Sequence, residues 1–319
     1  MRYKYSILLL LTSLLWAGNF VMGKWLVGHA SPITLTSLRW LIAIVCLLPF
    51  IMRQGKTALP PRQALLPLLL MGLTGVALFN TLQFLALDHT SATNVGLIST
   101  LNTVSIAIFS VLLLKDKISA VQTVAIALSL AGVVLVLSKG SSEVLLSLEF
   151  NRGDVYMLAA VGIWGIYSVC SKWAMMYVTP LAATFYSGIA GLLVLLPYNA
   201  ADFHVTDITG PFIGALLYTG VISTVVCFVL WNIGVQKLGA ASAGIYLNFN
   251  PIFTAILAFL LLGEQMTGTQ LAGSAIVIAG CYVFTAVKAK KPAAHLPADT
   301  EQELQLSAES EKRLQANSS

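Results

Sequence analysis

Long apolar runs follow one another through most of this chain, separated only by short polar or Gly/Pro-containing stretches. Each run reaches roughly the 20 residues that a helix needs to cross about 30 Å of hydrocarbon. The runs lie near residues 5–27, 32–52, 64–87, 91–114, 118–138, 154–174, 180–199, 211–236, 240–262 and 268–287. We therefore predict an all-α integral membrane protein with ten transmembrane helices.

The composition supports a membrane protein and argues against other classes. Hydrophobic residues make up 57% of the chain and charged residues 10%, so a soluble domain of this length would expose large apolar patches. The runs are continuously apolar rather than alternating, which argues against a β-barrel. The four cysteines lie inside predicted spans without CxxC spacing. We therefore expect no disulfide framework, no metal site and no cofactor.

Lysine and arginine are concentrated in alternate connections between the runs. The basic positions are Arg2 and Lys4; Arg53, Lys56 and Arg62; Lys115 and Lys117; Lys237; and Lys288, Lys290 and Lys291. The positive-inside rule makes these connections cytoplasmic, so both termini are expected there. The pI of about 9.0 reflects this asymmetry and does not indicate a nucleic-acid partner. Residues 289–319 are polar and without aromatic residues, which predicts a disordered cytoplasmic tail.

An internal repeat divides the chain. A shift of 148 residues places "WAGNFVMGKW" over "WGIYSVCSKW" without a gap, and it pairs Asn102 with Asn250 and Asp116 with Glu264. Apolar composition alone would not keep Trp, Asn and acidic positions in step over such a length. We therefore predict two five-helix units, 1–138 and 153–288. Because five is odd, the second unit would enter the membrane from the opposite side, which gives an inverted repeat.

Several motifs resemble one transporter family. The stretches "WAGNFVMGKW" and "SPITLTSLRW", with the paired endings "LLLKDKISAVQTVAIALSLAGVVLVL" and "LLLGEQMTGTQLAGSAIVIAGCYVF", resemble EamA-type members of the drug/metabolite transporter superfamily over residues 5–287. The resemblance implies a ten-helix carrier of the bacterial inner membrane that usually exports amino acids or related small metabolites. It also implies that helices 1, 3, 4, 6, 8 and 9 surround a central cavity.

Polar and aromatic side chains in the middle of the predicted spans are candidates for the substrate pathway, because such groups are costly in lipid and normally face the interior of a bundle. The alternative for a single amide is an interhelical hydrogen bond worth about 0.6 kcal/mol. The candidates are Trp16, Asn19, Lys24, Asn80, Gln83, Asn94, Asn102, Trp164, Tyr167, Ser171, Lys172, Trp231, Asn232, Tyr246 and Asn250.

Three basic residues inside or near the spans have two readings each. Lys24 near the outer end of helix 1 and Lys172 near the inner end of helix 6 either guard opposite mouths of the pathway or anchor the helices at the interface. Arg39 could bind a substrate carboxylate. Its place about seven residues into helix 2 favours instead a side chain that reaches outward to the membrane surface.

The remaining features concern helix breaks, helix contacts and rival functions. Pro251, which has no proline counterpart at Thr103, predicts a break in helix 9. Alanines spaced by four on helices 5 and 10 suggest that these helices make scaffold or homodimer contacts. They are Ala127, Ala131, Ala275 and Ala279. All thirteen acidic residues lie in loops, at helix ends or in the tail, so no mid-span proton relay is expected.

The leading prediction is an exporting carrier and no enzyme. The alternatives are a nucleotide-sugar or sugar-phosphate carrier and, in another class, an intramembrane lipid-modifying enzyme.

Overall fold

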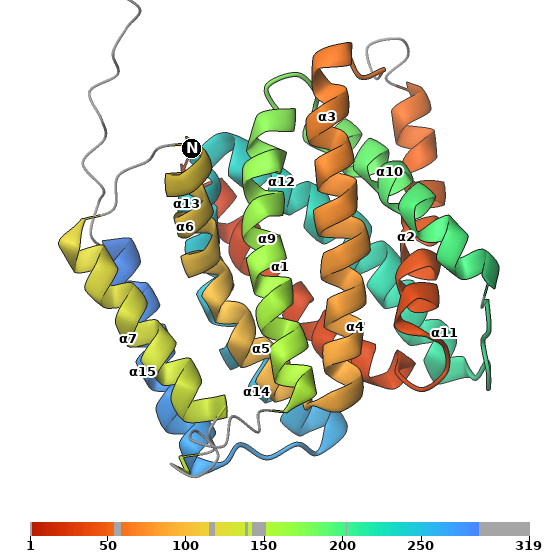
Figure 1. Cartoon of the computed structure of the whole chain (residues 1–319). Helices are drawn as coiled ribbons and strands as arrows, with labels where there is room; N and C mark the ends of the chain where they lie inside the picture. The colour runs from red at the N-terminus through yellow and green to blue at the C-terminus, as the bar shows by residue number, and fades with distance from the viewer. Residues whose placement is uncertain are drawn as a thin grey trace, which may run out of the picture.

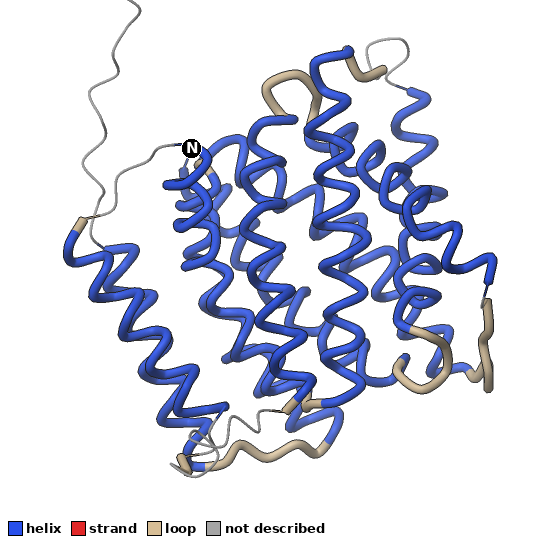
Figure 2. The backbone as a smooth tube through the Cα atoms, in the orientation of Figure 1, coloured by secondary structure: helices blue, strands red, loops and turns tan. Residues whose placement is uncertain are grey.

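The computed structural model describes residues 2–53, 59–114, 119–137, 140–141, 151–201 and 203–286. Within these ranges the regular elements are helices, as the backbone tube makes plain (Figure 2). Seven helices are long and apolar enough to cross a membrane, and three shorter apolar helices accompany them. The described part of the chain is therefore all-helical, and several of its helices are candidate membrane spans. The predicted tail and Asp116 lie outside the described residues.

The helices follow the predicted runs to within a few residues (Figure 1). Six runs form single helices: α1 (Arg2–Leu26), α2 (Pro32–Arg53), α7 (Ala120–Leu137), α9 (Arg152–Ala174), α10 (Pro180–Ala201) and α15 (Gly268–Ala286). Four runs are interrupted: α3 (Arg62–Met71), η2 (Gly72–Leu78) and α4 (Phe79–His89); α5 (Ala92–Ile98), η3 (Ser99–Leu101) and α6 (Asn102–Leu114); α11 (Gly210–Leu217), η4 (Tyr218–Val226) and α12 (Cys227–Leu238); α13 (Ala240–Gly244), η5 (Ile245–Phe249) and α14 (Asn250–Leu262).

The interruptions occur at equivalent places of the two halves. The π-helical segments η2 and η4 overlap after the shift of 148 residues, and so do the 3₁₀ segments η3 and η5. A π-turn leaves carbonyl groups without their usual α-helical partner, and side chains take them here. The Asn80 amide donates to the carbonyl of Gly75 at 2.6 Å, and the Thr224 hydroxyl donates to that of Thr219 at 2.7 Å. The two halves thus share their departures from α-helical geometry.

The predicted break at Pro251 is present, but it is not peculiar to the second half. Pro251 lies in the first turn of α14, directly after η5, where its missing N–H has no partner to lose. The first half breaks at Ser99–Leu101 without any proline. There the Ser99 hydroxyl donates to the carbonyl of Gly96 at 2.6 Å. Although Pro251 has no proline counterpart, the first half therefore breaks at the equivalent place, where a hydroxyl side chain stabilises the turn.

The helices α7 and α15 form a pair at one side of the bundle (Figure 1). A Cβ atom on Gly132 would lie 2.9 Å from the carbonyl oxygen of Gly273, and one on Gly280 would lie 2.9 Å from that of Ala125. The late part of each helix therefore packs on the early part of the other, which makes the pair antiparallel. The alanines at 127, 131, 275 and 279 are exposed, so they do not make this contact.

Candidate functional site

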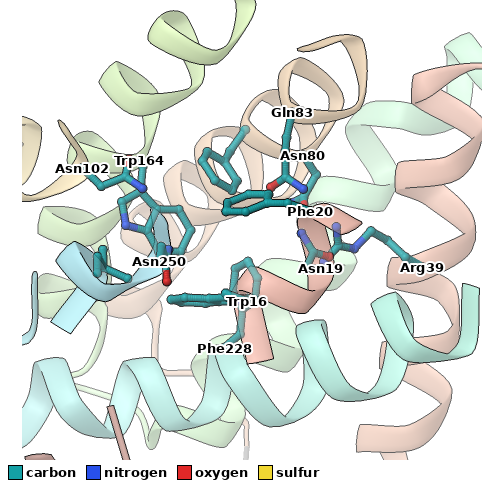
Figure 3. A pocket seen from close by; sticks show the side chains of 12 residues that line it. Trp16, Asn19, Phe20, Arg39, Asn80, Gln83, Asn102, Trp164, Phe228 and Asn250 are labelled. Atoms are coloured by element: carbon teal, nitrogen blue, oxygen red, sulfur yellow. The ribbon is translucent and has the colours of Figure 1, made fainter. Parts of the chain in front are cut away.

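A narrow cavity lies where the middle parts of the helices converge (Figure 3). The space open to the centre of a water-sized sphere is about 20 Å³, which is enough for one or two water molecules. The lining side chains come from α1, α2, α4, α6, α9, α12, η5 and α14. They are Trp16, Asn19, Phe20, Arg39, Phe79, Asn80, Gln83, Asn102, Trp164, Phe228, Leu247 and Asn250. Both halves of the chain therefore contribute to one site.

Aromatic rings form one wall of the cavity. The ring centroids of Trp16 and Trp164 are 5.3 Å apart at an interplanar angle of 89°, and Phe79 lies 4.7 Å from Trp164. Trp231 packs behind this wall, 5.6 Å from both tryptophans, and is fully buried without lining the cavity. Edge-to-face contacts of this kind hold rings in fixed orientations. The repeat-related pair Trp16 and Trp164 thus meets at the centre of the molecule.

Polar atoms without hydrogen-bond partners gather around the same cavity. Six of the lining residues each have one such buried atom: Asn19 Oδ1, Arg39 Nη1, Asn80 Oδ1, Gln83 Nε2, Asn102 Oδ1 and Trp164 Nε1. In the described parts of the chain, only Trp40, Trp231 and Thr254 have similar atoms elsewhere. Folded proteins pair the large majority of their buried polar groups. The concentration of these exceptions around one cavity makes it the candidate functional site.

Arg39 lies inside the bundle, and our expectation that it reaches outward was wrong. It is 1% exposed. Its Nε donates to the Thr224 hydroxyl at 3.0 Å and its Nη2 to the Ser223 hydroxyl at 3.2 Å. The guanidinium also lies 5.7 Å from the ring centroid of Phe84. Hydroxyl groups exposed by the π-helical segment η4 provide partners inside the bundle, so the side chain does not need to reach the headgroups.

Four of the predicted pathway residues lie away from the cavity lining, on the side of the second half. The hydroxyls of Tyr167 and Ser171 donate to Asn232 Oδ1 at 3.3 and 2.8 Å, and the Asn232 amide donates to Thr184 at 3.0 Å. This buried group joins α9, α12 and α10. Tyr246 is half-buried and does not line the cavity. The side chains of this buried group therefore bond to one another, whereas six side chains of the cavity each have one buried polar atom without a partner.

Lys24 lies at the end of α4. Its ammonium group donates to the carbonyl oxygens of Leu87 at 2.6 Å and Thr90 at 2.9 Å. The last carbonyls of a helix have no partner within the helix, and a cation there also interacts favourably with the helix dipole. Lys172, its counterpart in the repeat, is exposed near the end of α9. The two lysines are thus not equivalent in their surroundings.

Asn94 belongs to a polar cluster at the same end of the bundle. Its amide nitrogen lies 3.3 Å from Asp154 Oδ1, and its oxygen accepts a hydrogen bond of 2.6 Å from Gln270. Eight residues separate Asn94 from Asn102, which is about 12 Å along a helix. Because of this distance and the 3₁₀ segment between them, only Asn102 reaches the cavity.

Comparison with known proteins agrees with this architecture. The sequence profile of the EamA-like transporter family matches the chain twice, at residues 4–138 and 151–286. The chain belongs to the EamA-like transporter family. An uncharacterized transporter of Archaeoglobus fulgidus is 31% identical over 288 residues, which cover 90% of this chain and 99% of that protein.

Further relatives of this EamA-like transporter are more distant. The uncharacterized transporter YyaM of Bacillus subtilis is 28% identical over 88% of this chain and 93% of its own length. A probable terminal-alkyne amino-acid exporter of Streptantibioticus cattleyicolor is 26% identical over 69% of this chain and 73% of its own length. A crystal structure 20% identical to this chain gives a TM-score of 0.67 over 92% of this chain and 100% of that chain. That likeness shows a shared fold.

The cavity of this EamA-like protein contains residues that the sequence analysis did not single out. These are Phe20, Phe79, Phe228 and Leu247. The repeat contains a signal for one of them, since Phe228 is the counterpart of Asn80, which the analysis did select. The others are apolar residues in apolar helices, so polarity in mid-span could not distinguish them from residues that face lipid.

Proposed function

We propose that this EamA-like transporter is a secondary carrier that exports small polar or amphipathic metabolites, amino acids among them, by alternating access. The observation that carries the proposal is the ring of six buried polar atoms without partners around a cavity between the two halves. A site of this kind, at mid-depth and between structural repeats, is typical of carriers in which one half rocks against the other.

The proposal includes ten spanning helices arranged as two inverted five-helix units, 1–138 and 153–288. The equivalent positions of the π and 3₁₀ segments support a repeated unit. The antiparallel packing of α7 on its repeat counterpart α15 supports an inversion between the units. Each unit contributes a tryptophan and an asparagine to the cavity at equivalent positions.

The orientation belongs to the same proposal, with both termini in the cytoplasm of a bacterial cell and the chain in its inner membrane. Cysteine labelling tests it at two exposed positions in connections between helices. A cysteine at Leu59 is expected to be shielded from an impermeant thiol reagent in intact cells, whereas one at Ile208 should react. The reverse pattern would overturn the orientation.

Amino acids are the proposed cargo because one relative is named as an amino-acid exporter. A sugar-phosphate or nucleotide-sugar carrier is the second candidate, since Arg39 lies in the cavity and could meet a phosphate. The family and the relatives are named as transporters, which favours transport over an intramembrane enzyme. A small-molecule cargo and the lipid bilayer are the expected partners, and a homodimer is a further candidate.

Uptake into inverted membrane vesicles tests the function. Vesicles with and without the protein are supplied with labelled amino acids, nucleosides and sugar phosphates. We expect uptake of at least one amino acid that depends on the protein. A Trp164→Ala variant with an unchanged amount of folded protein should lose this uptake, because Trp164 lies at the centre of the cavity. Uptake of sugar phosphates alone would favour the second candidate, and uptake of none would contradict the proposal.

A further inference from the structure

We infer that the central site recognises cargo that bears a carboxylate group, and that Arg39 is the residue that binds this group. The inference rests on the proposed function, since it assigns a chemical class of cargo to the same cavity. It starts from the charge of the site. Among the described residues that line the cavity, Arg39 is the cation and none is acidic.

Among the residues that the structure describes, Arg39 has no acidic partner. Its two protein partners, Ser223 and Thr224, are neutral hydroxyl groups. A buried charge is costly in a membrane protein unless an opposite charge or a dense set of dipoles compensates it. An anionic group on the cargo would supply this compensation at the place where the bundle does not.

The geometry leaves one edge of the guanidinium available. Bonds from Nε and Nη2, with the ring of Phe84 5.7 Å away, fix the plane of the group. Nη1 is buried, has no partner, and belongs to a side chain that lines the cavity. Figure 3 shows the guanidinium directed from α2 toward Asn19. A group held in this way loses little conformational freedom when it binds an oxygen anion.

Helix packing does not by itself require an arginine at this position. The counterpart of Arg39 in the second half is Ser187, which is 1% exposed and donates to the carbonyl of Thr184 at 3.2 Å. The same helix of the second unit therefore packs around a small hydroxyl. Arginine in the first unit adds a charge that only this half of the cavity has.

The other unpaired atoms complement a carboxylate-bearing molecule with N–H groups. The side-chain oxygens of Asn19, Asn80 and Asn102 are acceptors at the same cavity, and an ammonium group needs acceptors. The aromatic wall of Trp16 and Trp164 offers an apolar surface. A phosphate carries more charge and is usually bound by several cations or helix N-termini, whereas a single guanidinium edge matches a carboxylate.

Tryptophan fluorescence provides a binding assay that does not depend on transport, because Trp16 and Trp164 line the cavity. The purified full-length protein is titrated with the twenty α-amino acids. The best ligand is then compared with its amide and with the amine that lacks the carboxylate. We expect the acid to bind about 10-fold to 100-fold more tightly than either analogue, as a charge-assisted hydrogen bond would give.

The variant Arg39→Gln should remove this preference. The acid is expected to bind no better than the amide, while the affinity for the amide changes by less than about threefold. Arg39→Lys should retain part of the preference, since it retains the charge without the planar fork. The matched control is Arg53→Gln, which makes the same substitution at an exposed position of the same helix and should leave the preference unchanged.

Four results would overturn the inference. These are equal affinity of the wild-type protein for acid and amide, binding of no carboxylate, a preference for inorganic or sugar phosphate, or an equal loss of affinity for all ligands in folded Arg39→Gln. If that variant does not fold, the wild-type comparison and Arg39→Lys decide. Export of amides as fast as acids would keep the proposed function and reject this inference. Carboxylate binding that depends on Arg39 without any export would do the reverse.

Discussion

The two halves of this protein share their helix breaks but line the cavity unequally: most of the polar side chains come from the first half, whereas aromatic rings come from both. The first half contributes polar side chains, among them Asn19, Asn80 and Gln83, and the second half contributes chiefly Trp164 and Phe228. The counterparts of those three polar residues are aromatic in every case: Tyr167, Phe228 and Trp231. The two halves therefore repeat one backbone arrangement and differ in the side chains that they place at the cavity.

The halves also differ in how they complete the third helix of each unit. In the first half, the ammonium of Lys24 donates to the carbonyl of Leu87 in the last turn of α4 and to that of Thr90, which follows the helix. In both halves the residue after this helix donates its backbone N–H four residues back, Thr90 to Ala86 and Gly239 to Val235, and Gly239 then turns the chain with a φ of 87°. Glycine adopts such a positive φ at little cost. In the first half the ammonium of Lys24 is added to this backbone bond, whereas its counterpart Lys172 is exposed.

The largest expected effect concerns a polar cavity residue of the first half and its aromatic counterpart in the second half. Gln83→Leu removes a polar group that the first half contributes to the cavity lining, and transport should fall at least about 10-fold with little change in thermal stability. Trp231→Phe changes the repeat counterpart of Gln83, which packs behind the aromatic wall, and transport should change no more than about threefold. Vesicle uptake per folded molecule measures both. Equal losses of transport in the two variants would show that the two positions do not differ in function.

The second comparison concerns the two lysines. Lys24→Met should lower the free energy of unfolding by about 1 to 3 kcal/mol, because two charge-assisted hydrogen bonds to helix carbonyls are lost. Lys172→Met should change it by less than about 0.5 kcal/mol, as for other surface substitutions. Denaturant titration in mild detergent measures both values. Loss of transport in both variants without loss of stability would instead support the hypothesis that the lysines guard opposite mouths.

Where the halves agree, substitutions should have equal effects. Gly132→Ala and Gly280→Ala each place a methyl group against the backbone of the facing helix, and each should cost about 1 to 3 kcal/mol of stability. Ala127→Leu, at an exposed position of α7, is the control and should leave the stability of the monomer unchanged. A large effect in one glycine variant alone would show that the α7–α15 contact is not symmetric.

The smallest expected effect concerns Glu264. Its carboxylate accepts hydrogen bonds of 3.0 Å from the backbone N–H groups of Ala92 and Thr93 at the start of α5. Glu264→Gln keeps the shape but removes the charge and one of the two acceptor oxygens from this helix N-terminus, and we expect a loss of about 0.5 to 1 kcal/mol. The same titration measures it. No loss in Glu264→Gln, together with a loss in Glu264→Ala, would assign the effect to hydrogen bonding rather than charge.

The sequence predicts the helices well and the site in part, for physical reasons. Hydrocarbon thickness determines the length of an apolar run, so the ends of the runs agree with the helices to within a few residues. Of the fifteen predicted pathway residues, seven line the cavity. They are Trp16, Asn19, Asn80, Gln83, Asn102, Trp164 and Asn250.

The remaining differences arise from contacts between distant parts of the chain. The depth of Arg39 in its own helix suggested an outward side chain, whereas its partners Ser223 and Thr224 come from η4, more than 180 residues away. The local sequence does not predict the π-helical segments either, because they occur where helices pack closely. Gly72, at the start of η2, lies against the backbone of Gly191 in α10. Such features require knowledge of which helices meet.

The antiparallel pair α7–α15 has a consequence for the ancestry of the fold. Gly132 meets Gly273 and Val277, and Gly280 meets the repeat counterparts of these two, Ala125 and Ser129. Such reciprocity defines an isologous interface, the kind that two copies of one chain form around a two-fold axis. The contact between the two units therefore has the form that two separate copies of a half-length chain would make, as expected of a chain that arose by gene fusion.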